Sequence, residues 1–98
     1  MKTLIASILV AFSFSALADC NPEAQFIGKV TKLKVYETHF TFQVSITRHF
    51  SASVVCPMFE GDLENAVLAY PGKPSIKNGD EISGVMVYDV ASDSYKID

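Results

Sequence analysis

The chain has 98 residues, of which 49% are hydrophobic, and a formal net charge of −3. Without Lys2, which belongs to the leader described next, six lysines and Arg48 stand against eleven acidic residues, a net charge of −4. A negatively charged domain gains no counterion-release energy on DNA or RNA, so the composition argues against a nucleic-acid partner. The length suits one small domain, and neither a linker nor an internal repeat divides it.

Residues 1–18 have the pattern of a secretory signal peptide. Lys2 provides the positive start, an apolar stretch runs from Leu4 to Phe14, and Ala16-Leu17-Ala18 provides the small side chains of a cleavage site. The alternative, a membrane anchor, is disfavoured because 14 residues from Leu4 to Leu17 would cover only about 21 Å of a hydrocarbon layer about 30 Å thick. We therefore expect one mature domain, residues 19–98, in the periplasm or the extracellular medium, with no integral membrane span after cleavage.

The mature chain holds two cysteines, Cys20 and Cys56. An even count in an oxidising compartment predicts a disulfide, and only one intramolecular pairing exists. Closing a loop of about 36 residues contributes on the order of 3–4 kcal/mol in the chain-entropy model. A reactive or metal-binding Cys56 is the alternative, but neither a CxxC pair nor a cysteine–histidine zinc spacing is present. Lipidation of Cys20 is a further alternative, although Asp19 stands where lipoprotein signals carry a small residue.

Two segments with period-2 patterns predict an antiparallel pair of strands. In the first, Gln25 to Tyr36, the apolar phase shifts by one residue near Thr31-Lys32, which indicates a bulge. A turn at Glu37-Thr38 leads to the second, Phe40 to Thr47, in which apolar and polar residues alternate without interruption. Its apolar face is expected in the core and comprises Phe40, Phe42, Val44 and Ile46. Its polar face comprises Thr41, Gln43, Ser45 and Thr47.

The second half of the sequence predicts three more strands and one helix. Ser53 to Phe59 is expected to form the third strand. Asp62 is a suitable N-cap for a short helix that ends at Pro71-Gly72. One face of that helix would carry Leu63, Ala66, Val67 and Tyr70. Turns around Asn78-Gly79-Asp80 lead to the last two strands, Ile82 to Val90 and Ser94 to Ile97.

This order of elements, three strands, a helix and two strands, predicts an all-β fold with one short helix. The arrangement β-β-β-α-β-β matches a small five-stranded OB-like barrel. A first strand that bends midway suits a closed barrel, and closure would leave no strand edge exposed. The alternative is an open α+β antiparallel sheet with the helix on one face.

The segment Phe26-Ile27-Gly28-Lys29-Val30-Thr31, followed by Phe40-Thr41-Phe42-Gln43-Val44, resembles the opening strands of secreted OB-fold domains of the netrin-like kind. These domains include the tissue inhibitors of metalloproteinases, and they also place a cysteine just after the signal peptide. The inhibitors begin with Cys-x-Cys, whereas Cys20 is followed here by Asn21 and Pro22. Bacterial toxin receptor-binding subunits are similar in size, fold and single disulfide. No functional residue is carried over from either family.

Several residues have side chains suited to catalysis or metal binding, but their spacing favours structural roles. His39 and His49 share a parity on the second strand, yet ten residues along an unbroken strand would separate them by about 33 Å. Other candidates are Glu60, Asp62 and Glu64, at the predicted helix start, and Asp80, Glu81 and Asp89, at and after a turn. Because no nucleophile elbow, phosphate loop or calcium-loop series frames them, we expect no enzyme activity, no metal and no cofactor.

The sequence therefore favours an exported, non-enzymatic binding or inhibitor-like module that recognises a protein or glycan surface. Its expected contact face is the polar row of Thr41, Gln43, Ser45 and Thr47. The alternatives are a small exported hydrolase or redox-active protein, and a receptor-binding subunit that assembles into rings. The identity of the partner and the oligomeric state do not follow from the sequence.

Overall fold

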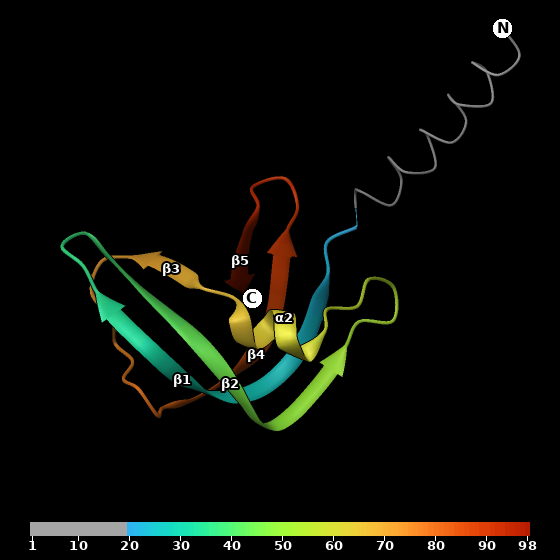
Figure 1. The fold of residues 1–98 in the computed structure, drawn as a ribbon, viewed down its shortest axis with the longest axis horizontal. Coiled ribbons are helices and arrows are strands. Elements are labelled where there is room, and N and C mark those ends of the chain that lie inside the picture. Colours follow the sequence, from blue (N-terminus) through green and yellow to red (C-terminus); the bar gives the residue numbers. More distant parts are fainter. Residues whose placement is uncertain (1–19) are drawn as a thin grey trace, which may run out of the picture.

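A computed structural model describes residues 20–98 and contains a mostly antiparallel five-stranded sheet with one short helix (Figure 1). The elements are β1 (Glu23–Val35), β2 (His39–Ala52), α2 (Glu60–Asn65), β3 (Leu68–Pro71), β4 (Glu81–Asp89) and β5 (Ser94–Ile97). The strands lie side by side in the order β3-β2-β1-β4-β5. The predicted signal peptide lies outside the described residues. Within residues 20–98, no helix has the length and apolarity needed to cross a membrane.

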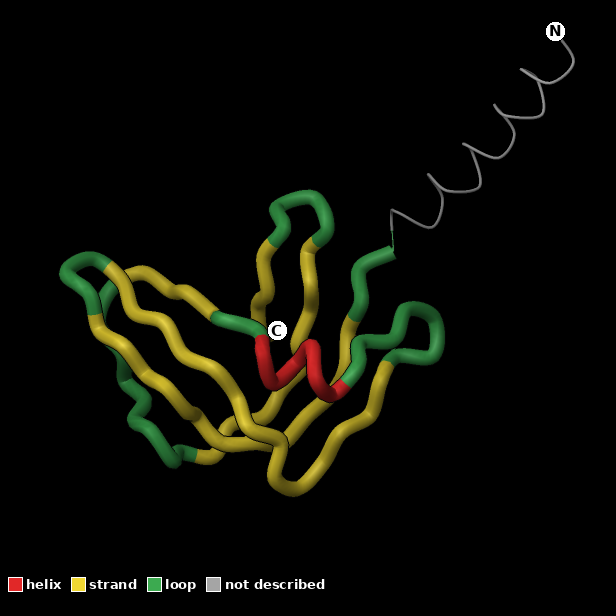
Figure 2. Tube along the Cα trace, viewed as in Figure 1, coloured by secondary structure: helices red, strands yellow, loops and turns green. Residues whose placement is uncertain are grey.

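The two long strands, β1 and β2, bend at two irregularities in their pairing (Figure 2). In the first, Thr31 pairs with Gln43 and Lys34 pairs with Thr41, so β1 contains one extra residue. Lys32 adopts a left-handed backbone there, with φ of 52°. This is the predicted bulge near Thr31-Lys32, and it is confirmed. In the second, the shift between Ile27 and Gly28 places extra residues in β2, a bulge that the alternation of apolar residues did not predict.

The sheet is open, so the prediction of a closed barrel is wrong and the alternative, an open antiparallel sheet, fits better. Within the described residues, the edge strands β3 and β5 share no ladder of paired residues. The Ile97 N–H instead donates a hydrogen bond of 3.1 Å to Tyr70 Oη, a side chain that reaches from one edge strand to the other.

The predicted third strand, Ser53 to Phe59, is a loop, so that prediction is wrong. β2 instead continues to Ala52, and the only β-type pairing in the loop is an isolated bridge between Pro57 and Glu23. The loop is held to the start of β1 by the Glu23 N–H, which donates to the Cys56 carbonyl at 2.9 Å, and by the Cys20–Cys56 disulfide. Its apolar residues suggested a strand, but Val54 and Val55 are 99% and 88% exposed.

The predicted helix from Asp62 to Tyr70 is also partly wrong. α2 has six residues, its N-cap is Phe59 rather than Asp62, and Ala66 already has extended backbone. The residues that follow form β3, which pairs with β2 through Leu68 and Phe42. Leu68 is fully buried and Val67 is 57% exposed, which is the alternation of a strand and not a helical face. Pairing with β2 therefore overrides the helical spacing of the apolar residues.

α2 covers the part of the β2 edge that β3 leaves free. β3 pairs only with residues His39–Phe42 of β2. Farther along this edge, the Ile46 N–H donates to Glu64 Oε2 at 2.8 Å, and Gln43 Nε2 donates to the Asn65 carbonyl at 3.1 Å. The first bond satisfies a backbone N–H of the edge that would otherwise be open to pairing with another chain, and the second ties the Gln43 side chain to the end of α2. The buried core comprises Ala24, Phe26, Val30, Phe40, Phe42, Val44, Met58, Leu63, Ala66, Leu68, Met86 and Val87.

Candidate functional site

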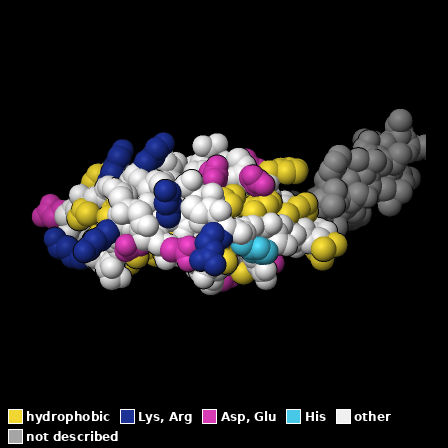
Figure 3. All heavy atoms as spheres, turned by 90° about the horizontal axis from the view of Figure 1, so that it is seen from below, with side chains coloured by type: hydrophobic (Ala, Val, Ile, Leu, Met, Phe, Trp, Pro, Cys, Tyr) yellow, Lys and Arg dark blue, Asp and Glu magenta, His cyan; other side chains and the backbone are white. Residues whose placement is uncertain are grey.

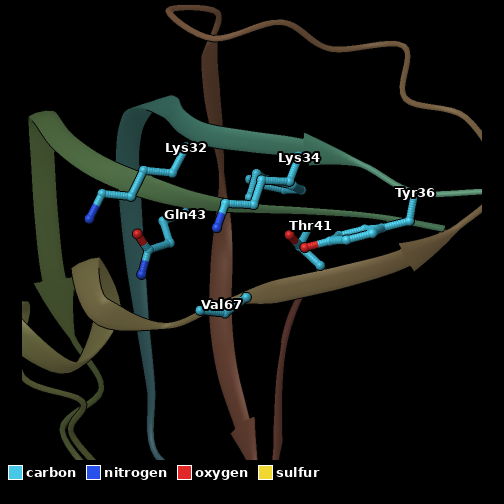
Figure 4. Close-up of a pocket in the computed structure, with 7 residues that line it drawn as sticks. Lys32, Lys34, Tyr36, Thr41, Gln43 and Val67 are labelled. Atoms are coloured by element: carbon cyan, nitrogen blue, oxygen red, sulfur yellow. The ribbon is translucent and has the colours of Figure 1, made fainter.

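An open groove lies on the face of β1 and β2 that points away from the core. It has a volume of about 380 Å³ and is called here the outer groove. Its floor is formed by β2, the lysines come from β1, and Val67, just before β3, lies on the opposite side (Figure 4). The lining residues are Lys32, Lys34, Tyr36, Thr41, Phe42, Gln43 and Val67.

The β1 bulge is what brings two lysines to the same side of the groove. Lys34 pairs with Thr41 on the outer face, and the extra residue Lys32 lines the groove from the bulge. Both side chains extend from β1 across β2 (Figure 4). Lys29, which pairs with Ser45, is exposed on the same strand. Basic side chains gather over the half of the molecule that contains the β1–β2 turn (Figure 3), although the chain as a whole is negative.

The polar groups of the groove are held in place by neighbouring contacts. The bond from Gln43 to the Asn65 carbonyl fixes the amide, whose oxygen is on the β1 side (Figure 4). The Tyr36 ring stacks on His39, with ring centroids 4.7 Å apart and planes 13° from parallel, and extends towards Thr41. The groove thus combines two ammonium groups, a hydroxyl, an amide and an aromatic ring on an open surface. Such a set can bind an anion through charge and hydrogen bonds while an apolar surface stacks on the ring.

The structure brings only half of the predicted contact row into this groove. Thr41 and Gln43 line it. Ser45 is half-buried farther along β2, and Thr47 lies at the second bulge, where its hydroxyl donates to the Ile27 carbonyl at 3.3 Å. The four residues therefore do not line one groove, because β2 bends between Ser45 and the Thr47 end.

The other candidate side chains lie apart or make structural contacts. His39 begins β2 and His49 lies near its far end, so the two histidines are not brought together. Asp80 Oδ2 accepts the Lys77 N–H at 2.9 Å, which stabilises the turn before β4. Glu81 forms an exposed ion pair with Arg48 at 3.4 Å. Among residues 20–98, no three His, Cys, Asp or Glu side chains are placed to share a metal ion, and no cysteine is free.

The alternation of apolar and polar residues did not identify Lys32, Lys34, Tyr36 and Val67 as members of the site. Lys32 lines the groove only because the bulge shifts the alternation of β1 by one residue. Val67 lines it only because an extended segment leading into β3 replaces the predicted helix. The sequence feature that could have identified the site is the cluster of three lysines within six residues around the predicted bulge.

The chain matches no protein-family model, no curated protein and no solved structure.

Proposed function

We propose that this protein is an exported, non-enzymatic binding module whose outer groove recognises an acidic glycan. The observation that carries the proposal is the meeting of Lys32 and Lys34 with the Tyr36 ring over a polar floor of Thr41 and Gln43. Ammonium groups favour carboxylate or sulfate substituents, the hydroxyl and amide suit sugar hydroxyls, and an aromatic ring accepts the apolar face of a sugar.

The shape of the groove favours a chain-like ligand over a small enclosed one. It is open, and its lining residues include Val67, just before β3, and Tyr36, just after β1, but neither Glu37 nor Thr38. The site therefore lacks the buried pocket in which a single small molecule loses most of its contact with water. A glycan lying across the strands would contact both lysines at once.

The non-enzymatic part of the proposal is supported by the roles of the side chains with catalytic potential. The carboxylates of Glu64, Asp80 and Glu81 each bind a neighbouring backbone or side-chain group. The two cysteine sulfurs are bonded to each other, which leaves neither as a thiolate nucleophile.

Export is proposed from the signal-peptide pattern of residues 1–18, and the disulfide supports it because such bonds persist in oxidising compartments. When the full chain is expressed in a secreting bacterium, we expect the protein in the periplasm or medium to begin near Asp19. Its intact mass should be two hydrogens below that of the dithiol form. A product that still begins at Met1, or that carries both thiols, would contradict the proposal.

Glycan recognition is tested with a double variant, Lys32→Gln with Lys34→Gln. Binding is measured by calorimetry against a sulfated and a uronic-acid oligosaccharide, with neutral dextran fragments as the reference sugar. Each lysine contact with a bound anion is worth roughly 0.5–1 kcal/mol at an exposed site, so the double variant should bind about tenfold more weakly. Binding of the unmodified protein should also weaken as salt is added.

The matched control carries Lys73→Gln and Lys77→Gln, which remove the same charge from exposed positions outside the groove. The control should bind the acidic sugars nearly as well as the unmodified protein. Equal losses in both double variants would mean that only net charge matters, and the outer groove would then not be the site. Tighter binding of an acidic peptide than of either sugar would replace the glycan by a protein partner.

A further inference from the structure

The turn between β3 and β4 is hydrogen-bonded to β1 beyond the point where the β1–β4 ladder ends. The last pair of that ladder is Lys29 with Glu81. Farther along, the Gly79 N–H donates to the Val30 carbonyl at 2.8 Å, and the Val30 N–H donates to the Asp80 carbonyl at 2.9 Å. The segment that leads into β4 therefore continues alongside β1 (Figure 1).

Asn78 in this turn is bonded to the β1 bulge. Its Oδ1 accepts the Leu33 N–H at 2.9 Å, from a residue 45 positions away in the sequence. Leu33 follows Lys32, the residue with left-handed backbone that lines the outer groove. A bulge interrupts the ladder of the two strands, and here the Asn78 side chain satisfies a backbone group beside the interruption. The turn thus holds the part of β1 on which the position of the groove lysines depends.

Asn78 is followed by Gly79, and this pair of residues favours deamidation. Glycine has no side chain to shield its backbone nitrogen, so that nitrogen can attack the side-chain amide of the preceding asparagine. Both residues are exposed, and a Cβ atom at Gly79 would meet no atom within 4 Å, so water reaches this peptide bond. Of the other asparagines, Asn21 precedes a proline, whose nitrogen carries no hydrogen, and Asn65 precedes an alanine, whose methyl group hinders the attack.

The reaction has two steps. The Gly79 nitrogen bonds to Asn78 Cγ, the Cγ–Nδ2 bond breaks, and ammonia leaves with the proton of the Gly79 nitrogen. The resulting five-membered imide then takes up one water molecule. Opening at Cγ gives aspartate. Opening at the backbone carbonyl gives isoaspartate, in which the main chain runs through Cβ and Cγ and is one carbon longer.

The bonds to β1 oppose the first step. The attacking nitrogen is the one whose N–H is bonded to Val30, and the amide under attack is the one bonded to Leu33. Ring closure removes the proton that Val30 accepts and rotates the Asn78 amide, so the turn has to detach from β1 first. The rate of the reaction in the folded protein therefore depends on how often the turn opens locally.

We propose that Asn78 is a site of spontaneous deamidation, that the hydrogen bonds of its turn to β1 keep the reaction slow in the folded protein, and that isoaspartate at this position loosens the β1 bulge. The longer main chain moves Gly79 relative to the Asn78 side chain, so the bonds to Val30 and Leu33 no longer fit together. Deamidation at this turn does not depend on glycan binding in the outer groove.

The rate is measured at mildly alkaline pH by mass spectrometry of proteolytic peptides, which detects the replacement of the amide NH₂ by OH. The folded, disulfide-bonded protein is compared with the same chain in concentrated guanidinium chloride. Asn78 should react at least about tenfold more slowly in the folded protein, because two hydrogen bonds must break first. Asn21 and Asn65 are internal references that should stay unchanged over the same period in both states.

Equal rates at Asn78 in the two states would overturn the proposal, because the bonds to β1 would then give no protection. Absence of the reaction in the unfolded chain would overturn it as well. Earlier reaction at Asn65 than at Asn78 would have the same consequence.

A pair of variants at Lys32 tests whether the bulge in particular protects Asn78. Lys32→Gly and Lys32→Ile both remove the charge, but glycine favours the left-handed backbone of this position and isoleucine opposes it. Each folded rate is divided by the rate of the same variant in guanidinium chloride. The normalised rate should be at least about fivefold higher for Lys32→Ile than for Lys32→Gly. Equal normalised rates would overturn the role of the bulge.

The effect of the product is measured on the isoaspartate form, separated from aged protein by chromatography. Its Leu33 amide proton should exchange with solvent at least about tenfold sooner than that of the unmodified protein. The control is Asn78→Asp, which adds the same charge, keeps an acceptor oxygen and leaves the main chain unchanged. Its Leu33 amide should exchange as in the unmodified protein. Unchanged exchange in the isoaspartate form would contradict the loosening of the bulge.

Discussion

Replacing Cys20 and Cys56 together with serine is expected to lower the free energy of unfolding by about 3–4 kcal/mol. The bond closes a 36-residue loop, and its loss restores conformational freedom to the unfolded chain. A domain of this size has a small core, so the loss represents a large fraction of its total stability. Urea unfolding followed by circular dichroism measures the change.

The local structure predicts which part of the fold loosens first in that variant. The loop from Ser53 to Phe59 is attached to β1 through the disulfide and through Glu23, whose carbonyl accepts the Ser53 and Met58 N–H groups. Without the covalent bond, amide protons of this loop should exchange with solvent sooner than those of β1 and β2, which pair over most of their length.

Chemical reduction provides the control for this prediction. A reducing agent should destabilise the unmodified protein by the same amount as the double serine substitution and should not affect the double variant. A decrease in the free energy of unfolding below about 1 kcal/mol in both experiments would contradict the role of the disulfide as the main stabilising cross-link of the fold.

The substitution Gly28→Ala is expected to lower the free energy of unfolding by about 3 kcal/mol. A Cβ atom at this position would lie 2.5 Å from the Ser45 carbonyl oxygen and 2.8 Å from Val44 Cγ1. The Ser45 oxygen belongs to the backbone of β2, so it cannot move aside as a flexible side chain would. The strands would have to separate at the bend, next to the buried Phe26 and Val30.

Gly61→Ala is the matched control for this substitution. Gly61 lies in α2, and a Cβ atom there would meet no atom within 4 Å. Alanine favours helix, so the control should be unchanged or more stable by up to about 1 kcal/mol. Denaturant unfolding of both variants under identical conditions gives the comparison. Equal stability of Gly28→Ala and the unmodified protein would show that the two strands can separate at the bend without cost.

Local patterns were sufficient where a segment needs few distant contacts to choose its structure. Alternation predicted β2 and its core face, and the slip in the alternation of β1 predicted the bulge at Lys32. The last strand, Ser94 to Ile97, has the predicted bounds. The cysteine count allowed one intramolecular pair, which is the pair in the structure. In each case, neighbouring residues or simple counting carried the information.

Segments whose structure depends on distant partners were predicted less well. Leu63, Ala66, Val67 and Tyr70 fit a helical face, but β2 offers a strand edge at Phe42 that the sequence pattern does not reveal. Ser53 to Phe59 has strand-like residues but lacks a neighbouring edge to pair with beyond a single bridge. Propensity is a weak preference in such short segments, and hydrogen bonds with a distant strand decide the outcome.

The sequence by itself determined the chemistry available to this protein: a polar row on β2, a group of early lysines, acidic residues near the helix and a disulfide staple. Only the tertiary structure decided which of these groups meet. The bulge and β3 assemble Lys32, Lys34 and Val67 around Thr41 and Gln43, while the second bulge removes Thr47 from that set. The reason is geometric, because a single extra residue in a strand changes which side chains share a face, and that change depends on the partner strand.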